Sequence, residues 1–424
     1  MINELYQKAF ELDKKDELSH FKEEFISEPN TVYLDGNSLG KLPKKTIEQT
    51  NNLVTNQWGK GLIRSWNEHW IDLPQKTAAK IAQIVGAQPD EIFVGDSTSL
   101  NLYKLAFAAL SLNSSKKKVI SDTLNFPTDL YILQGLIEQQ FKDHSLNLIE
   151  SRDGITVAEQ AFEEALDSNT ALIVLSHVVF KSAFMYDMPR INALAHQKDA
   201  LVIWDLSHSV GSVPVNLNES EADMAVGCTY KYLNGGPGAP AFLYIRKDLQ
   251  KQLQSPIWAW FSHQTPFDFS LDYQPKDTIQ RFAVGTPSVL SLAAIESGLD
   301  ITLEAGIDRL RAKSRQQSEF LIELIEQLLV PLGFSIASPL DVNQRGSHIS
   351  IRHPEGYRIS QAMIKPHDES KVIIPDFRPP DNIRLGIAPL YNTFTELVDS
   401  VERIWKIVAE EQYQEYSNDR AIVT

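Results

Sequence analysis

The sequence contains one cysteine, Cys228, among its 424 residues. A single cysteine allows neither a disulfide within the chain nor a cysteine-based zinc cluster. No run of about 18 apolar residues occurs, so no segment is typical of a transmembrane helix. The first residues also lack the apolar core of a secretory signal. These absences predict a cytoplasmic protein with no membrane partner.

Positive charge is scarce as well. The chain has 40 Lys and Arg residues against 55 Asp and Glu residues, a formal net charge of −15. A nucleic-acid partner held through its phosphates requires the opposite balance, so we expect none. The acidic surface is interpreted as an aid to solubility. No pair of histidines has the spacing of a metal site on a helix, and we expect no metal.

Short apolar runs separated by helix-length segments dominate the middle of the chain. Such runs predict strands buried on both faces of a mixed sheet in an α/β domain. Beyond a long helical region at about 290–330, two segments alternate with period two and a helical apolar stripe follows. We predict an N-terminal helix and arm (1–44), a large domain (45–300) and a smaller α+β domain (301–424) on which the first helix packs. The apolar runs are EIFVG, KKVIS, TALIVLS, ALVIWD, ADMAVGC and APAFLYI.

Lys231 lies in a stretch that is almost free of charge, GCTYKYLNGGPGAPAFLYI. The nearest charged residues along the chain are Asp223 and Arg246. Burial at a strand end among aromatic side chains disfavours the ammonium form of a lysine. A neutral amine can form a Schiff base, which is the usual start of pyridoxal phosphate (PLP) chemistry.

Asp205 ends a predicted buried strand, 26 residues before Lys231. Ligands of open α/β sheets bind at that edge, and PLP enzymes place an acidic partner at the pyridine nitrogen. His208, three residues later, is suited to orient this carboxylate. The alternative is that Asp205 caps the next helix.

Two further segments are typical of a PLP site. Ser97, Thr98 and Ser99 precede an apolar helical pattern, where hydroxyls and free N–H groups can bind phosphate, although a plain helix cap is the more common use. Phe126 follows the next strand and is placed to lie against a flat ring, although such residues are more often part of the core. Phosphate loop, aromatic residue, Asp and Lys come in this order at successive strand ends, and together they indicate PLP.

Five segments resemble the bacterial kynureninase family. The resemblance extends from about residue 33 to 394. It implies the PLP-dependent, aminotransferase-like fold type I and a homodimer with sites at the subunit interface. It also implies hydrolysis of the Cβ–Cγ bond of L-kynurenine or 3-hydroxykynurenine in tryptophan degradation, giving L-alanine and anthranilate or its 3-hydroxy form. The segments are YLDGNSLG, DSTSLNLYK, DLSHSVG, GCTYKYLNGGPGAPAFLYI and IRLGIAPLYNTF.

The resemblance also implies roles for individual residues. Lys231 would carry the cofactor and act as base, Asp205 would pair with the pyridinium nitrogen, and Tyr230 would move protons late in the cycle. Arg384 would clamp the substrate α-carboxylate, for which its planar fork is suited. Further substrate contacts are implied for Ser38, Trp66 and Trp258. Further cofactor contacts are implied for Thr98, Ser99, Phe126, Pro127, Thr128, Asp129, Ser176, His208 and Tyr230, and for Trp260 and Thr286 toward the cofactor of a partner subunit.

Some positions depart from the family pattern. Trp258 stands where a small residue is usual, Val179 and Phe180 replace an Asn-Tyr pair, and Pro375 replaces a glycine. These departures surround the expected substrate side. They leave open a related enzyme that acts on another γ-keto or β-substituted amino acid.

Three other classes of protein compete with this interpretation. A cysteine desulfurase requires a mobile nucleophilic cysteine, whereas Cys228 is predicted to be buried at a strand end. An aminotransferase is compatible with Lys231 and Asp205 but not with the glycine-proline string after the lysine. A non-catalytic nucleotide-binding or scaffold protein is disfavoured because no glycine-rich phosphate loop of the common kinds occurs.

Overall fold

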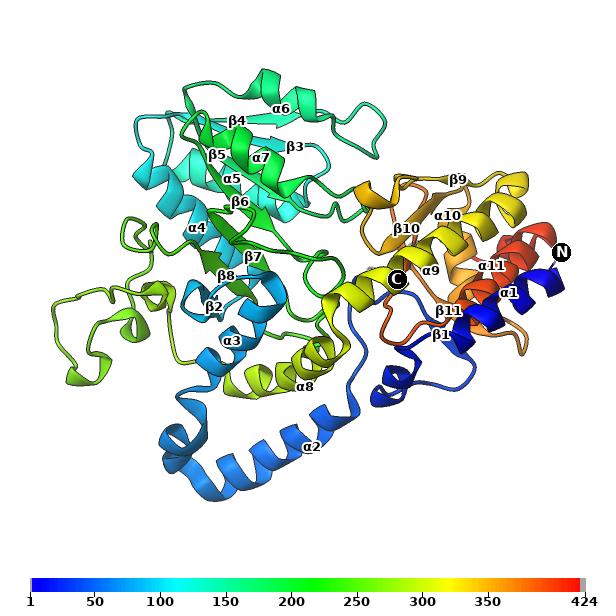
Figure 1. Cartoon of the computed structure of the whole chain (residues 1–424), viewed down its shortest axis with the longest axis horizontal. Helices are drawn as coiled ribbons and strands as arrows, with labels where there is room; N and C mark the ends of the chain where they lie inside the picture. Colours follow the sequence, from blue (N-terminus) through cyan, green and yellow to red (C-terminus); the bar gives the residue numbers. More distant parts are fainter. Residues whose placement is uncertain (1, 420–424) are drawn as a thin grey trace.

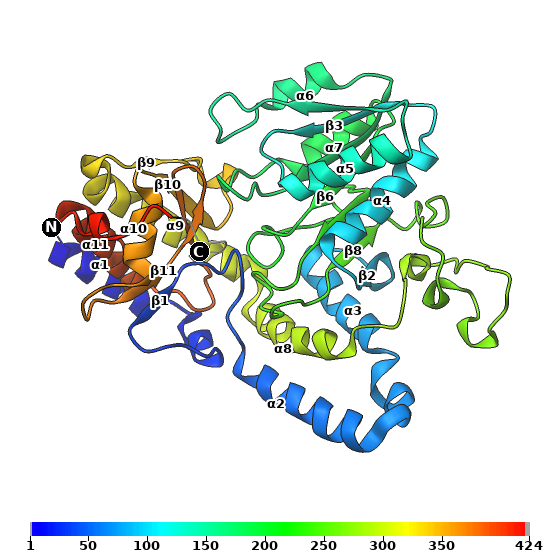
Figure 2. The same cartoon turned by 180° about the vertical axis from the view of Figure 1, so that it is seen from behind.

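A mixed seven-stranded sheet forms the centre of the larger part of the molecule (Figures 1 and 2). The computed structural model describes residues 2–419. The strand order is β2-β8-β7-β6-β5-β3-β4, and β8 is the strand of this described sheet that runs antiparallel to its neighbours. The strands are β2 (Ile92–Val94), β3 (Lys118–Asp122), β4 (Ser145–Ile149), β5 (Thr170–Ser176), β6 (Leu201–Asp205), β7 (Met224–Gly227) and β8 (Phe242–Ile245).

The six apolar runs of the sequence supply six of these strands. Every residue of β5 is buried, as expected for a central strand of a parallel sheet. The seventh strand, β4, was not predicted. Its sequence SLNLI lies at the edge of the sheet and only Ile149 is buried, so it carries no continuous apolar run.

Helices cover both faces of this sheet. Side chains of β6 alternate between the faces: Val202 and Trp204 join the cluster that includes α3, α6, α7 and α8, whereas Ile203 joins the cluster that includes α4 and α5. The helices of this part are α2 (Lys44–Asn52), α3 (Leu73–Val85), α4 (Thr98–Leu112), α5 (Pro127–Gln139), α6 (Glu159–Ala165), α7 (Met188–His196) and α8 (Val289–Ala305). Two π-helical segments, Leu53–Gly61 and Trp66–Trp70, follow α2.

A second hydrophobic core lies at the other end of the molecule. It joins the first helix to the C-terminal elements, with Leu5 and Ala9 packed among residues of α9, β10, β13 and α11. We therefore keep the division into residues 1–44, 45–300 and 301–424 as a proposal. The elements are α1 (Ile2–Lys14), α9 (Ile307–Leu328), α10 (Gly356–Ile364), α11 (Phe394–Ala409), the antiparallel sheet of β9 (Ser335–Ile336), β10 (His348–Arg352), β12 (Asp376–Arg378) and β13 (Asn382–Gly386), and the parallel pair β1 (Thr31–Tyr33) and β11 (Val372–Ile374).

The long helical region expected at about 290–330 is two helices. Gly306, with φ +78°, separates α8 from α9. Glycine adopts a positive φ of this kind without steric strain, whereas other residues do so at a cost in free energy. The presence of glycine at position 306 therefore explains why the helix breaks there. Within residues 2–419, no helix is long and apolar enough to cross a membrane.

Asp13 joins the first helix to the last one. Its carboxylate accepts hydrogen bonds from the backbone N–H groups of Phe394 (2.6 Å) and Thr395 (2.9 Å) at the start of α11. An acidic side chain at this position satisfies free N–H groups and complements the helix dipole. We expect Asp13→Ala to lower the free energy of unfolding by about 1–2 kcal/mol, measured by urea denaturation. Gln7→Ala, an exposed change on the same helix, is the control and should alter stability by less than about 0.5 kcal/mol.

Candidate active site

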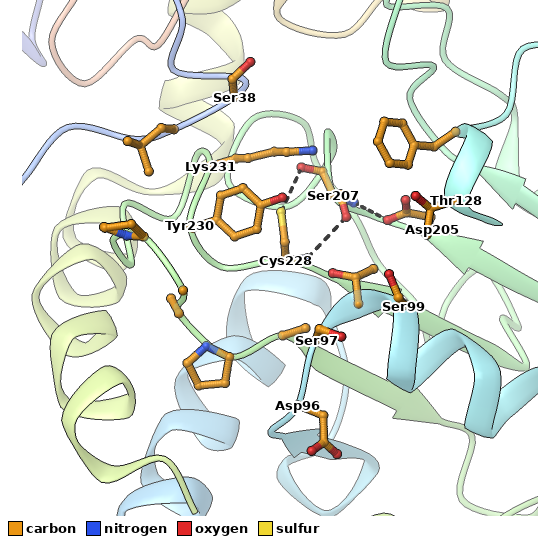
Figure 3. Close-up of a pocket in the computed structure, with 18 of the residues that line it drawn as sticks. Ser38, Asp96, Ser97, Ser99, Thr128, Asp205, Ser207, Cys228, Tyr230 and Lys231 are labelled. Atoms are coloured by element: carbon orange, nitrogen blue, oxygen red, sulfur yellow. Dashed lines mark hydrogen bonds between the residues drawn. The ribbon is translucent and has the colours of Figure 1, made fainter. Parts of the chain in front are cut away.

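A cavity of about 600 Å³ opens where the parallel strands of the large sheet end. Figure 3 shows its lining, with Ser38 and the Ser97–Ser99 turn on opposite sides of Lys231 in this view. The edge is the one at which open α/β sheets bind ligands. The lining residues are Ser38, Leu39, Asp96, Ser97, Thr98, Ser99, Phe126, Thr128, Asp129, Asp205, Ser207, His208, Cys228, Tyr230, Lys231, Pro237, Gly238, Ala239, Pro240, Ala241 and Ser288.

Lys231 reaches the cavity from the segment that follows β7. Its Nζ lies 3.4 Å from Nε2 of His208 and 5.8 Å from the ring centroid of Tyr230. The backbone around it is held tightly, because the Gly40 N–H donates to the carbonyl of Tyr230 at 2.8 Å. A Cβ on Gly40 would lie 2.2 Å from the carbonyl oxygen of Lys231, so this approach of the N-terminal arm requires glycine.

Asp205 ends β6 with its carboxylate buried. The N–H of Ser207 donates to Oδ1 at 2.8 Å. Burial raises the pKa of Asp205, while the hydrogen bonds from Ser207 and the charge of Lys231 oppose that rise. His208, expected to orient this carboxylate, has its Nε2 beside Lys231 Nζ, and its role toward Asp205 stays a prediction. Burial, together with the charges of Lys231 and Arg384, lowers the pKa of His208 well below its usual value, so its imidazole is neutral.

The turn before α4 supplies hydroxyl groups at the opposite end of the cavity. Ser97 caps the helix, its Oγ accepting the N–H of Leu100 at 3.3 Å. That use leaves Thr98 and Ser99 in the first turn, beside helix N–H groups that have no partner within the helix. Beneath the turn, buried Lys104 donates to Asp96 Oδ2 (2.8 Å) and to a backbone carbonyl (2.8 Å).

The loop between β3 and α5 forms one wall. Phe126 lies at the rim, with its ring 5.2 Å from and perpendicular to the ring of Phe180, and Pro127 begins α5. Asp129 is 2% exposed and its Oδ2 has no hydrogen-bond partner among the described residues. Burial, and then the charge of Asp205, raises the pKa of Asp129 well above its usual value. Ser176 donates to Asn125 Oδ1 at 2.7 Å behind this loop.

Arg384 lies behind the cavity wall and is 1% exposed. Its guanidinium donates to Asp376 Oδ2 (2.5 Å), to the carbonyl of Phe180 (2.6 Å) and to the hydroxyl of Ser38 (2.9 Å). Ser38 itself lines the cavity. The two residues expected on the substrate side are therefore in contact, with Ser38 between the cavity and the arginine.

Seven residues expected at the site are absent from the lining of this cavity. Pro127, Ser176 and Arg384 belong to the surrounding segments described above, and the other four lie elsewhere in the described chain. Trp258 is 68% exposed and stacks on Tyr273 with ring centroids 4.9 Å apart. Trp260 donates its indole N–H to a backbone carbonyl at 2.6 Å, and Trp66 packs edge-on against Trp70. Thr286 lines a separate cavity of about 220 Å³. Their predicted contacts, some of which belong to a partner subunit, stay predictions.

Several residues at the site escaped sequence reasoning. Ser207, Asn125 and Asp376 hold predicted residues in place through hydrogen bonds. Ser207 and Asn125 are adjacent in sequence to predicted site residues, so their position along the chain could have indicated a role at the site. Asp376 had none, since it meets Arg384 only through the pairing of β12 with β13.

The donor set fits PLP. The cavity offers an amine at Lys231, a buried carboxylate at Asp205, and hydroxyls beside a helix N-terminus at Thr98 and Ser99. The buried Oδ2 of Asp129 has no hydrogen-bond partner among the described residues. A polar group of a ligand would supply one, because an unpaired buried acceptor is costly.

Comparison with known proteins agrees with this assignment. Residues 310–404 match the family model for the kynureninase C-terminal domain. The chain is 39% identical over 402 residues to kynureninase from Pseudomonas fluorescens, covering 94% of both chains. It is 38% identical over 413 residues to kynureninase from Burkholderia mallei (strain SAVP1), covering 96% of both. The chain belongs to the kynureninase family. It is thus an enzyme of a class of hydrolases that act on carbon–carbon bonds.

Solved structures identify the fold. A cysteine desulfurase from Thermococcus onnurineus NA1 superposes with a TM-score of 0.79 at 18% identity, over 92% of this chain and 98% of that chain. A cystine lyase variant with glycine linked covalently to its PLP cofactor has a TM-score of 0.77 at 18% identity, over 91% of this chain and 98% of that one. The predicted PLP-dependent fold type I is confirmed. Cys228 is 2% exposed, in agreement with the prediction that it is a buried residue.

Proposed function

We propose that this kynureninase-family enzyme hydrolyses the Cβ–Cγ bond of L-kynurenine or 3-hydroxykynurenine, releasing L-alanine and anthranilate or 3-hydroxyanthranilate. One observation carries the proposal. A single cavity gathers Lys231, Asp205 and the Thr98–Ser99 turn, and the Ser38–Arg384 pair closes its far side. These are an amine, an acid, a phosphate-binding turn and a carboxylate-binding residue.

Residues of the cavity would bind both the aldehyde side and the phosphate side of PLP. Lys231 would hold it covalently through Nζ, Thr98 and Ser99 would bind its phosphate with Tyr230, and Asp205 would hold the proton on its ring nitrogen. Phe126, Pro127, Thr128, Asp129, Ser176 and His208 would complete its surroundings. When bound, PLP supplies an electron sink for negative charge at the substrate Cα.

Proton transfers belong to residues of the chain. Lys231 Nζ is our candidate base for the Cα proton, and neutral His208, 3.4 Å away, is placed to orient it. Burial raises the pKa of Tyr230 above its usual value, so its phenol keeps its proton at neutral pH. A phenol in that state can donate a proton late in the cycle, as C–C cleavage leaves a basic centre on the substrate.

The test of the cofactor is direct. Protein purified with PLP should be yellow, and borohydride should fix the cofactor's mass on the peptide that contains Lys231. Lys231→Ala should abolish that mass gain, whereas Lys80→Ala, a surface lysine paired with Asp300, should retain it. Colourless protein, or a mass gain on another lysine, would contradict the assignment.

The test of the reaction is release of anthranilate from L-kynurenine, compared with 3-hydroxykynurenine, followed by fluorescence. Lys231→Ala should lower kcat by about 10³-fold or more, since it removes both cofactor attachment and base. Arg384→Lys should raise KM by roughly tenfold, because lysine lacks the bidentate fork. Arg352→Lys, on neighbouring β10, is the control and should leave KM unchanged. A yellow protein that cleaves neither compound would favour another γ-keto amino acid as substrate.

We further propose a homodimer whose contact surface includes the segments around residues 53–70 and 256–291. Large apolar side chains of these segments are exposed in the isolated chain. Ile63 is 78% exposed, Leu271 is fully exposed, and Phe267 and Phe269 are exposed over most of their surface. Leu53, Trp58 and Trp70 line an apolar hollow of about 410 Å³ with residues 287–291. Exposed apolar surface of this extent is typical of an interface. A second copy would also bring Trp260 and Thr286 toward its partner's cofactor.

Substitution on this surface should separate the subunits. We expect Phe269→Asp to shift the sedimentation coefficient from dimer to monomer and to weaken PLP retention, because a buried unpaired carboxylate opposes association. Phe10→Asp, at an exposed position of α1 at the other end of the molecule (Figure 1), is the control. Wild-type protein that sediments as a monomer at micromolar concentration would refute the dimer.

A further inference from the structure

A cluster of four charged side chains lies between the N-terminal arm and the small antiparallel sheet. Asp376 Oδ2 accepts from Arg384 Nε at 2.5 Å and lies 2.9 Å from Nε of Arg378. Ser38 links Arg384 to the turn that begins at Asp35, since the N–H groups of Ser38 and Leu39 both donate to the carbonyl of Asp35. Asp35 itself pairs with Gly386, two residues beyond Arg384, in an isolated parallel bridge.

The charges of this cluster balance only while no ligand is bound. Arg378 and Arg384 contribute two positive charges, and Asp35 and Asp376 contribute two negative ones when both are ionised. A substrate carboxylate beside Arg384, as the proposed function requires, adds a third negative charge. An unbalanced charge in a buried site is costly, so one of the acids must take up a proton or the carboxylate binds weakly.

Asp35 is the acid suited to accept that proton. Its Oδ1 is buried and has no hydrogen-bond partner among the described residues. Burial, and then the charge of Asp376, raises the pKa of Asp35 to about 6, against the hydrogen bond from Ser38 and the charges of Arg384 and Arg378. Asp376, in contrast, is enclosed by the two arginines.

The tyrosines and histidines around Asp35 stay neutral near pH 7. Burial raises the pKa values of the phenols of Tyr33, Tyr232 and Tyr391. Burial and the charge of Arg384 lower the pKa values of His208 and His348. Asp35 is therefore the group of this neighbourhood whose charge changes most readily at physiological pH.

We propose that binding of the substrate α-carboxylate at Arg384 is coupled to uptake of one proton from water by Asp35, and that departure of the amino-acid product releases it. This inference rests on the proposed function of the same cavity. Asp35 acts as a positioning residue. In its protonated form it restores the charge balance of the cluster, and its carboxylic acid group can donate a hydrogen bond to a neighbouring oxygen. The proton comes from a hydronium ion or a buffer acid, which loses its bond to that proton, and it adds to one carboxylate oxygen of Asp35.

The coupling fixes the direction of the pH dependence. Below about pH 6 Asp35 of the free enzyme already carries its proton, and carboxylate binding requires no uptake. Above that pH each binding event must take up a proton, so affinity falls by up to roughly tenfold per pH unit. With asparagine at position 35 the side chain is neutral at every pH, and this dependence disappears.

Calorimetric titration of the PLP-loaded enzyme with L-alanine tests the coupling. At pH 7.5, heats measured in two buffers of different ionisation enthalpy give the number of protons taken up. Asp35→Asn should take up about one proton fewer per site than wild type and should bind L-alanine more tightly at pH 8. Any protonation change of the cofactor itself occurs in both proteins and cancels in the difference. L-Alaninamide, which has no carboxylate, should give the same proton count in both.

Two further variants guard against a purely structural effect. Ser38→Ala removes a hydrogen bond that favours ionised Asp35, so the pH at which L-alanine affinity begins to fall should move upward. Asp122→Asn changes another buried acid whose pKa burial raises to about 6, but which bonds to Tyr186 rather than to the cluster. It should retain the proton uptake of wild type.

The outcomes separate the two proposals. Equal proton uptake in wild type and Asp35→Asn, with L-alanine bound by both, overturns the coupling and leaves the proposed function intact. No binding of L-alanine by yellow wild-type enzyme overturns the proposed function and the coupling with it. Loss of uptake in Asp122→Asn as well as in Asp35→Asn would also overturn the assignment to Asp35.

Discussion

The parallel register of β5, β6 and β7 is the constraint on which the site depends. It pairs Ser176 with Asp205 and Asp205 with Val226, at the carboxyl ends of three successive strands. Lys231 follows five residues after Val226, so the chain has only a short turn in which to bring its amine back to the same edge. Asp205 would not be buried without this sheet, and a buried carboxylate requires the N–H groups and the nearby amine that the edge provides.

Local signals in the sequence were sufficient for six of the seven strands of the large sheet. Each central strand is a nearly continuous apolar run, because both of its faces are covered by helices. The polar residues that end such runs, Asp205 among them, must therefore lie at the edge where ligands bind. The same reasoning fails for β4 and β9, which lie at sheet edges and carry no such run. Trp258 was assigned to the site from family resemblance alone, and that assignment stays a prediction.

Contacts between distant parts of the chain could not be predicted. Ser38 and Arg384 are 346 residues apart in sequence, and no spacing rule connects them. Asp35 lies in the same segment as Ser38, but its burial, its unpaired oxygen and its closeness to Asp376 exist only once the arm crosses β13. A sequence can place an acid three residues before a serine; only the fold buries an oxygen of that acid and raises its pKa.

The likeness to cysteine desulfurases separates what the fold fixes from what it leaves free. At 18% identity the two share the fold. In this chain Cys228 lies in the same cavity as Lys231 but is buried, with its thiol directed at the carbonyl of Ser207 (3.8 Å). The substrate side that we propose is formed by three other segments: the arm turn at 35–40, the loop at 177–186 whose Phe180 carbonyl accepts from Arg384, and the hairpin of β12 and β13. We propose that the substrate preference of this chain depends on these segments more than on the neighbours of Lys231, and the departures at Val179 and Phe180 fall within one of them.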